Sequence, residues 1–289
     1  AQLRFRLHFP AGLLLNMRAL ILSLTLCLSG CMPAFFQPST AIYHTPGQFG
    51  LEYEPVEMRA ADGTELFAWF LPARGTPRAT VLYLHGNGEN ISTQFANVAW
   101  LPANGFNVLA LDYRGYGGSQ GHPTFAGVQL DIDAAMRTLL ARRDVDPQRI
   151  IVFGQSLGAA LAVHYVAHTQ YRKNVRAVIL DSPFSDYRLI AREKLAGFFL
   201  TWPFQWLPRV TMENEFSPAA SIEALSPIPV LFIHGEQDLI VPVHHSQRLY
   251  DRAREPKQLW VVPDSGHIQA VKSRTWRQRL TEFLQRHAG

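Results

Sequence analysis

The sequence is short of charged residues and almost free of cysteine. Charged side chains make up 17% of the 289 residues, against 47% that are hydrophobic. That balance excludes a disordered chain and a coiled coil, and it favours one large globular core. The two cysteines, Cys27 and Cys31, both lie near the amino terminus, so no disulfide framework holds the rest of the chain.

Excess positive charge is also scarce once the amino terminus is set aside. Of the 27 lysines and arginines, three (Arg4, Arg6 and Arg18) lie in residues 1–30, which hold no acid, so 24 basic residues face 23 acidic ones beyond that segment. No run of lysine or arginine follows that would track the phosphates of a nucleic acid. Nucleic acid is therefore not an expected partner.

The amino terminus has the layout of an export signal. Arg18 precedes an apolar run from Ala19 to Leu28, and small residues follow it. The run is roughly half as long as a bilayer crossing requires, so a membrane-spanning helix is the weaker interpretation. We expect translation to start at Met17, and we expect residues 1–30 to be a leader that is removed.

The end of this leader, the segment Leu-Ser-Gly-Cys that finishes at Cys31, is similar to the bacterial lipobox. The resemblance implies that Cys31 is acylated and becomes the first residue of a membrane-anchored lipoprotein. Because the next residue is Met32 and not aspartate, it also implies the outer membrane, facing the periplasm. An ordinary signal with a chance cysteine, or a buried N-terminal helix, is the alternative. Residues 31–50 are expected to be an unstructured tether.

Short apolar runs alternate with helical patterns over the rest of the chain. After a hairpin over 56–71, strands are expected at 79–84, 106–111, 149–153, 175–180, 230–234 and 258–262. Helices are expected at 92–104, 127–142, 157–169, 246–253 and 274–287. This order is typical of an α/β domain with a mostly parallel sheet covered on both faces. Functional sites in such sheets lie beyond the carboxyl ends of the strands.

The alternation stops in an insert at about residues 184–229 of the predicted domain, which spans 51–289. The insert is rich in large apolar residues: Phe198, Phe199, Trp202, Phe204, Trp206 and Leu207. One interpretation is a small helical lid that covers the strand ends and walls an acyl pocket. The other is a helical excursion that closes the core.

A Gly-x-Ser-x-Gly segment, Gly154 to Gly158, falls between an apolar strand and a helix. This is the setting of a nucleophile elbow, a tight turn that exposes the serine and leaves no room for side chains at either glycine. Ser156 is therefore the candidate nucleophile, although a glycine-rich turn with a capping serine has the same pattern. A serine hydroxyl needs a base that is itself held by an acid.

Two later segments supply those partners. Asp238 lies on the loop after the strand at 230–234, and His267 follows the last strand. Asp181, directly after the strand at 175–180, is the rival acid. Other histidines are present, but none of them follows the last strand: His85, His122, His234, His244 and His245.

The segment His85-Gly-Asn-Gly88 follows the strand that ends at Leu84, and its glycines let backbone amides face inward. The N–H groups of Asn87 and Leu157 are the expected oxyanion donors. His85 is expected to brace this loop. Asp112 and Arg114, in a later loop, are expected to form a structural pair.

Together these motifs resemble an α/β hydrolase of the small-lid branch, which is often labelled lysophospholipase-like or serine-aminopeptidase-like. The motifs are His85-Gly-Asn-Gly88, Leu111-Asp-Tyr-Arg-Gly-Tyr-Gly-Gly-Ser119, Gly154-Gln-Ser-Leu-Gly158, His234-Gly-x-x-Asp238-x-x-Val-Pro242 and Ser265-Gly-His267. The resemblance covers about residues 54–287. It implies Ser156 as nucleophile, Asp238 as acid and His267 as base, with Asn87 and Leu157 as oxyanion donors. The lipoprotein signal is not a requirement of this fold.

Three functions stay open. The first is a membrane-anchored serine esterase that cleaves carboxylic ester or thioester bonds of a small apolar acyl substrate. The second is an amidase or aminopeptidase with the same triad, in which carboxylates of the insert hold an amine: Glu193, Glu213, Glu215 and Glu223. The third is a non-catalytic lipoprotein that uses the fold to bind. No cofactor is expected, and no cluster of histidine, cysteine and glutamate has metal-ligand spacing.

Overall fold

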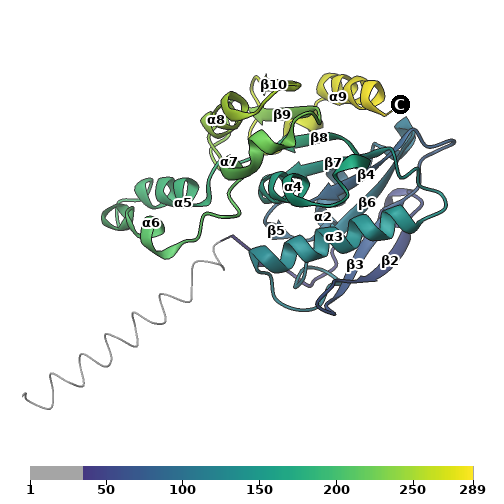
Figure 1. Ribbon diagram of the computed structural model, residues 1–289, viewed down its shortest axis with the longest axis horizontal. Coiled ribbons are helices and arrows are strands. Elements are labelled where there is room, and N and C mark those ends of the chain that lie inside the picture. The colour runs from purple at the N-terminus through teal and green to yellow at the C-terminus, as the bar shows by residue number, and fades with distance from the viewer. Residues whose placement is uncertain (1–34, 289) are drawn as a thin grey trace, which may run out of the picture. The chain divides into compact units, whose positions relative to one another are not determined.

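Eight strands form one mixed sheet in the order β10-β9-β8-β7-β4-β6-β3-β2 (Figure 1). The structure is a computed structural model that describes residues 35–288, so the export signal and Cys31 lie outside the described residues. The strands are β2 (Glu54–Arg59), β3 (Glu65–Leu71), β4 (Ala79–Leu84), β6 (Phe106–Asp112), β7 (Ile150–Gln155), β8 (Val175–Asp181), β9 (Val230–Gly235) and β10 (Lys257–Val262). β2 and β3 form the expected antiparallel hairpin, and the six strands from β10 to β6 pair in parallel.

Helices cover the sheet as expected for this fold class. They are α2 (Ile91–Gln94), α3 (Phe125–Ala141), α4 (Leu157–His168), α5 (Tyr187–Ala196), α6 (Leu207–Thr211), α7 (Pro218–Ser221), α8 (His244–Arg252) and α9 (Arg274–His287). Figure 1 shows α3 and α4 across one face of the sheet, whereas α5 and α6 stand away from it. Within residues 35–288, no helix is both long and apolar enough to cross a membrane.

The central strands are buried on both faces. All six residues of β4 are buried, and alternate positions serve different layers. Val81 and Tyr83 join a large core cluster that includes Leu280 and Phe283 of α9. Helix α4 packs against β4, β7 and β8. This double coverage is why the strands are continuous apolar runs in the sequence.

The helix expected over 92–104 is broken. Only α2 is α-helical, and 3₁₀ turns follow at Phe95–Asn97 and Pro102–Asn104. Pro102 has no N–H to continue a helix, and Gly105 at φ 84° ends the second turn in a left-handed conformation. The remaining expected helices are present, with shifts of a few residues at their ends.

The segment before the first long strand differs from the expected tether. The compact unit of the chain begins at Phe36, and the Phe36 side chain is buried against the ring of Phe125. Gln37–Pro38 forms strand β1, which pairs in parallel with β5 (Gly88–Glu89). No periodic pattern marks this segment in the sequence, because backbone hydrogen bonds, and not a repeat of apolar residues, pair it with β5.

The insert between β8 and β9 contains α5, α6 and α7. Helix α5 is capped by Asp186, whose side chain accepts a hydrogen bond from the N–H of Leu189. The aromatic side chains of the insert were expected to cover the strand ends, but they face solvent. Phe199 is 76% exposed and Trp202 is 58% exposed. In this structure they therefore do not wall a pocket.

Candidate active site

Ser156 occupies a strained turn between β7 and α4. Its φ of 52° and ψ of −114° lie in a region that non-glycine residues rarely adopt. A side chain at Gly154 would come within 3.0 Å of the backbone of Gly158, and one at Gly158 would come within 3.0 Å of the backbone of Leu84. The two glycines thus let strand, turn and helix approach closely enough to aim Ser156 outward, as the nucleophile-elbow pattern predicts.

The structure brings Ser156 together with the two residues that the sequence proposed as its partners. His267 Nε2 lies 2.9 Å from Ser156 Oγ, and His267 Nδ1 lies 2.7 Å from Asp238 Oδ2. The three residues come from loops after β7, β9 and β10, which end at the same edge of the parallel sheet. This is the hydrogen-bond sequence of a serine, a base and an orienting acid.

Several donors hold Asp238 in its ionised form. Its Oδ1 accepts hydrogen bonds from the N–H groups of Ile240 (2.9 Å) and Val241 (2.8 Å). His234 Nε2 lies 3.3 Å from Oδ2. Burial raises the pKa of Asp238, but the hydrogen bonds with His234 and His267 outweigh burial and hold this pKa well below its ordinary value. Sequence patterns had left His234 without a role, because its contact depends on how the Asp238 loop folds back.

Asp181, the rival acid, is committed to other groups. Its carboxylate accepts a hydrogen bond from Gln155 Nε2 at 2.8 Å and one from Ser182 Oγ at 3.3 Å, and its backbone C=O accepts one from the N–H of Ser156. Burial raises the pKa of Asp181 to about 6. Asp181 therefore holds the backbone of the serine turn in place, whereas Asp238 contacts His267.

The segment from His85 to Gly88 lies beside Ser156, and neighbouring residues fasten it at several points. A Cβ added to Gly86 would stand 3.6 Å from Ser156 Cβ. The N–H of Gly86 donates to Gln94 Oε1, Tyr116 Oη donates to the C=O of Asn87, and the N–H of Gln37 donates to Asn87 Oδ1.

Leu157 completes the pair of expected oxyanion donors. It opens α4, so its N–H is one of the first-turn groups that have no acceptor inside the helix. Asn87 and Leu157 stay the predicted oxyanion donors. The residues that hold the Asn87 segment come from distant parts of the chain and carry no local signal.

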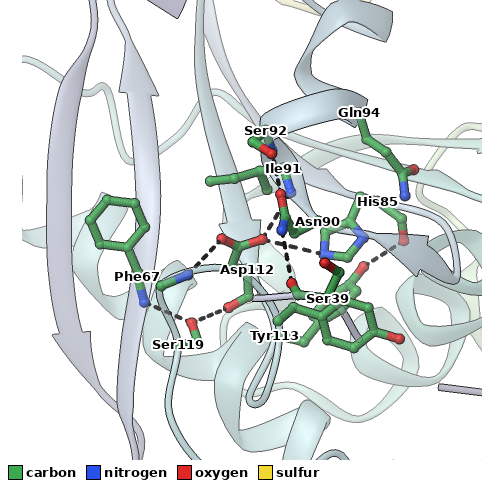
Figure 2. A network of polar contacts seen from close by, with 12 residues as sticks. Ser39, Phe67, His85, Asn90, Ile91, Ser92, Gln94, Asp112, Tyr113 and Ser119 are labelled. Atoms are coloured by element: carbon green, nitrogen blue, oxygen red, sulfur yellow. Dashed lines mark hydrogen bonds and ion pairs between the residues drawn. The ribbon is translucent and has the colours of Figure 1, made fainter. Parts of the chain in front are cut away.

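A buried polar network lies behind the same segment (Figure 2). His85 Nδ1 donates to the C=O of Gly86 at 2.7 Å, and its Nε2 lies 3.8 Å from Asp112 Oδ1. Asp112 accepts hydrogen bonds from the N–H groups of Ile91 (2.9 Å) and Gly118 (3.3 Å). Burial raises the pKa of Asp112 to about 7 and lowers that of His85 to about 4. His85 thus has the structural position that the sequence predicted.

The expected pair of Asp112 and Arg114 does not form. Arg114 turns to the other side of its loop, where its guanidinium contacts Asp131 and Asp62, each at 2.7 Å. The two carboxylates neutralise Arg114, and Asp112 is left with neutral donors and His85. The prediction was wrong because two side chains that are two positions apart in a loop need not point in the same direction.

A cluster that no sequence spacing indicated links the insert to the body of the domain. Glu193 of α5 lies 3.1 Å from His244 Nε2 and 3.0 Å from His245 Nε2. These three groups are close enough to share a metal ion. However, His245 Nδ1 accepts a hydrogen bond from the N–H of Ser185, so the proton of the neutral ring is on Nε2 and points at Glu193. The cluster is therefore a hydrogen-bonded link and not a preformed metal site.

Comparisons with known proteins agree with the fold. The family model described as serine aminopeptidase S33 matches residues 75–224, more than half of the chain. The uncharacterized protein YfhR of Escherichia coli K12 is 38% identical over 257 residues, which is 86% of this chain and 86% of that protein. WAV2 of Arabidopsis thaliana, an alpha/beta hydrolase domain-containing protein, is 34% identical over 84% of this chain and 82% of its own length.

A solved structure is similar over nearly the same region. The esterase Pf2001 of Pyrococcus furiosus matches with a TM-score of 0.70 and 26% identity, and the match covers 88% of this chain and 100% of that chain. The parallel sheet, the strained serine turn and the matches over most of the chain point the same way. The chain therefore belongs to the α/β hydrolases, in the family described as serine aminopeptidase S33.

Proposed function

We propose that this hydrolase is a serine esterase, which cleaves carboxylic ester or thioester bonds of an apolar acyl substrate with Ser156 as nucleophile. The observation that carries the proposal is the pair of hydrogen bonds at His267, 2.9 Å to Ser156 Oγ and 2.7 Å to Asp238 Oδ2. Asp238 accepts the proton on Nδ1 and so leaves the Nε2 lone pair facing the serine hydroxyl. The geometry is thus prepared for proton transfer from Ser156.

In the proposed reaction, Ser156 Oγ attacks the substrate carbonyl while its proton passes to His267 Nε2. The N–H groups of Asn87 and Leu157 stabilise the negative oxygen of the tetrahedral intermediate. When this intermediate collapses, His267 gives the proton to the leaving alkoxide or thiolate, and the acyl group stays on Ser156 as an ester. Water then attacks that ester with His267 again as base, releasing the carboxylic acid and regenerating the serine.

Asp238 keeps His267 in the tautomer that each step requires, and it stabilises the imidazolium that forms transiently. Its low pKa supports this role, because the carboxylate stays ionised over the working pH range. His234 and the two backbone donors in the Asp238 loop fix the orientation of the carboxylate.

An amidase or aminopeptidase is the second candidate, and the ion pairs of the insert weigh against it. Glu193 is bound to His244 and His245. Glu223 lies 3.5 Å from Arg252 and 3.6 Å from Arg254. Two of the four carboxylates that were candidates for holding a substrate amine are therefore already paired with cations or histidines.

A matched substrate panel tests this choice. Purified enzyme is assayed with p-nitrophenyl esters and with p-nitroanilides of the same acyl groups, and with anilides of unprotected amino acids. We expect turnover of the esters, with anilide rates at least 100-fold lower. Faster release from amino-acid anilides would overturn the ester assignment in favour of a peptidase. Ser156→Ala is the control for non-enzymatic hydrolysis.

We also propose that the enzyme is a bacterial lipoprotein attached through Cys31, on the periplasmic face of the outer membrane. The support is the sequence alone, namely the apolar run from Ala19 to Leu28 followed by Ser29, Gly30 and Cys31. Mass spectrometry of the mature amino terminus tests the proposal. A diacylated Cys31 is expected, whereas an unmodified cysteine or a different first residue would leave a plain exported hydrolase.

A further inference from the structure

The insert carries a group of large apolar side chains that the rest of the described chain does not cover. The members, which we call the insert face, are Phe198 (52% exposed), Phe199 (76%), Leu200 (60%), Trp202 (58%), Phe204 (50%), Trp206 (58%) and Val210 (67%). Isolated exposed apolar residues are ordinary on soluble proteins, but a contiguous group with two tryptophans marks an interaction site. Most of these residues lie in the segment that joins α5 to α6, two helices that stand away from the sheet (Figure 1).

Exposed apolar side chains are also present on the loop that holds the proposed acid. Leu239 and Ile240 directly follow Asp238, and they are 90% and 54% exposed. Lys194 Nζ of α5 lies 3.4 Å from the C=O of Leu239, so the insert and this loop are in contact. Whatever covers the insert face therefore also comes near the Ser156 site.

The charges along the segment that carries the face are mostly basic, and the exposed acids Glu213 and Glu215 follow it. Arg192, Lys194 and Arg209 are exposed on the same stretch of chain. Residues 187–211 contain a single acid, Glu193, and its carboxylate is bound to two histidines of α8. Segments that lie in the interface of an anionic bilayer are typically rich in tryptophan and phenylalanine, with lysine and arginine nearby.

The amino-terminal end of the domain lies at the base of the insert. Phe36 packs on Phe125 with ring centroids 5.2 Å apart, and Phe125 packs on Tyr187, the first residue of α5, at 4.4 Å. Four residues lie between Cys31 and Phe36, so the chain between these two residues spans about 18 Å at most. A lipid on Cys31 would thus hold the base of the insert close to the membrane surface.

We infer that the insert face docks on the surface of an anionic lipid bilayer, and that the natural substrates are acyl lipids presented at that surface. The second half of this inference rests on the proposed esterase function. Docking brings the Asp238 loop and the Ser156 site to the level of the lipid esters. A water-soluble ester would reach the site without docking.

Tryptophan fluorescence tests the docking step on the full chain. The protein has six tryptophans, and Trp202 and Trp206 lie on the insert face, whereas Trp69 and Trp260 are buried. The protein is reconstituted into vesicles of phosphatidylcholine and phosphatidylglycerol that contain a brominated phosphatidylcholine. We expect bromine to quench the wild-type emission and to lose most of this effect on Trp202→Phe/Trp206→Phe. Equal quenching of both proteins, or none of either, would overturn the docking.

A kinetic experiment separates docking from catalysis. The variant Phe199→Glu/Trp202→Glu is compared with the wild type on a short soluble ester and on an ester lipid in anionic vesicles. Phe49→Glu, which changes an apolar side chain that is 61% exposed outside the insert, is the matched control. Removing each anchor side chain should weaken vesicle binding roughly tenfold.

We expect activity on vesicles to fall at least tenfold for the double variant alone, with kcat/KM on the soluble ester unchanged. Equal activity on vesicles would overturn the inference and leave the esterase intact. No activity of the wild type on either ester would instead overturn the proposed function. If the face joins two copies of this chain, sedimentation will show a dimer that the double variant dissociates, and bilayer docking is then wrong.

Discussion

His267 has two buried carboxylates within its neighbourhood, and hydrogen bonds decide which of them orients it. Asp238 Oδ2 lies 2.7 Å from Nδ1, whereas the Asp181 carboxylate accepts from Gln155 and Ser182. The pKa values also separate, since that of Asp238 is held low and that of Asp181 is raised to about 6 by burial. Both carboxylates are mostly ionised at neutral pH, so it is the hydrogen bond to His267 Nδ1 that assigns Asp238 as the orienting acid.

Asp238→Asn should lower kcat by about 10⁴-fold, because an amide favours the wrong tautomer of His267. Asp181→Asn should lower kcat by less than about tenfold, since it changes only the support of the serine turn. Steady-state hydrolysis of a soluble ester measures both, with circular dichroism to check that each variant is folded. A larger loss for Asp181→Asn would reverse the assignment of the acid.

Asp112 makes the stability of the domain depend on pH. Its pKa rises from 3.8 to about 7 on folding, so between these pH values the folded state keeps a proton that the unfolded state has lost. The wild type therefore loses free energy of unfolding as the pH rises through this window, by up to about 1.4 kcal/mol per pH unit, and the loss ends above it.

Asp112→Asn removes this dependence. We expect the difference in unfolding free energy, wild type minus variant, to decrease from pH 4 to pH 7 and then to level off. Urea titrations at several pH values measure the difference. Asp251→Asn, on the exposed side of α8, is the control. A difference for Asp112→Asn that is constant over this range would show that Asp112 does not carry the buried proton.

The residues of the site divide into those with a local signal and those without one. Ser156 and the backbone of Leu157 could be predicted because strand, turn and helix are contiguous in sequence. Asp238 and His267 could be placed because both follow parallel strands, which end at one edge. The partners of Arg114 could not be predicted from the sequence, because Asp131 lies on α3 and Asp62 lies in the hairpin turn. The contacts of a loop side chain depend on the direction in which it points, and the spacing of residues in the sequence does not specify that direction.

Among the larger elements, the amino-terminal segment gives the clearest difference between sequence and structure. Asn90 Nδ2 donates to the C=O groups of Ser39 and Ala41, and the N–H of Gly117 donates to the C=O of Ser39. The segment thus lies against the loop that carries Asn87. A domain that begins near Pro38, which a free tether would permit, lacks Phe36 and the Gln37 contact to Asn87.

Two truncations test the importance of this segment. A chain that begins at residue 35 should keep the activity of the mature protein, whereas one that begins at residue 44 should lose at least tenfold in kcat. The reason is that the Asn87 donor is no longer held, and one oxyanion donor is worth roughly 10²–10³ in rate. Ester hydrolysis and circular dichroism are measured together. Equal kcat for two folded truncations would mean that the segment is only a tether.

A point variant tests the contacts of the amino-terminal segment without deleting any residues. Asn90→Ala removes two hydrogen bonds to the segment and the cap of α2, so we expect a loss of about 2–3 kcal/mol in unfolding free energy. Asn104→Ala, which removes one local hydrogen bond, should cost about 1 kcal/mol. Denaturant titration measures both. Equal losses would mean that the contacts of Asn90 to Ser39 and Ala41 add little.

The order and direction of the long elements could be predicted well, and the short ones could not. The parallel strands and α3, α4, α8 and α9 follow from apolar periodicity. The exposure of the insert aromatics depends on how the insert folds. The link from Glu193 to His244 of α8 joins residues that are 51 positions apart in the sequence. Local patterns carry no information about such contacts.

At the scale of the whole molecule, we propose that a lipid on Cys31 and the insert face together hold the enzyme at a membrane. If Cys31 is acylated with several chains, the protein should stay in the membrane fraction at high salt. Cys31→Ala should change the distribution of the precursor and release any exported protein under the same wash. Fractionation with immunodetection measures this, and loss of the wild type at high salt would contradict a lipid anchor.

If Ser156 is an activated nucleophile, it should react with a fluorophosphonate probe, and mass mapping of the adduct locates the reaction. The wild type and Ser156→Ala are treated with the probe, digested and sequenced by mass spectrometry. We expect one phosphonylated peptide, which contains Gly154 to Gly158 with the adduct on Ser156, and no adduct in the variant. An unlabelled wild type, or an adduct on another residue that persists in Ser156→Ala, would contradict this role of Ser156.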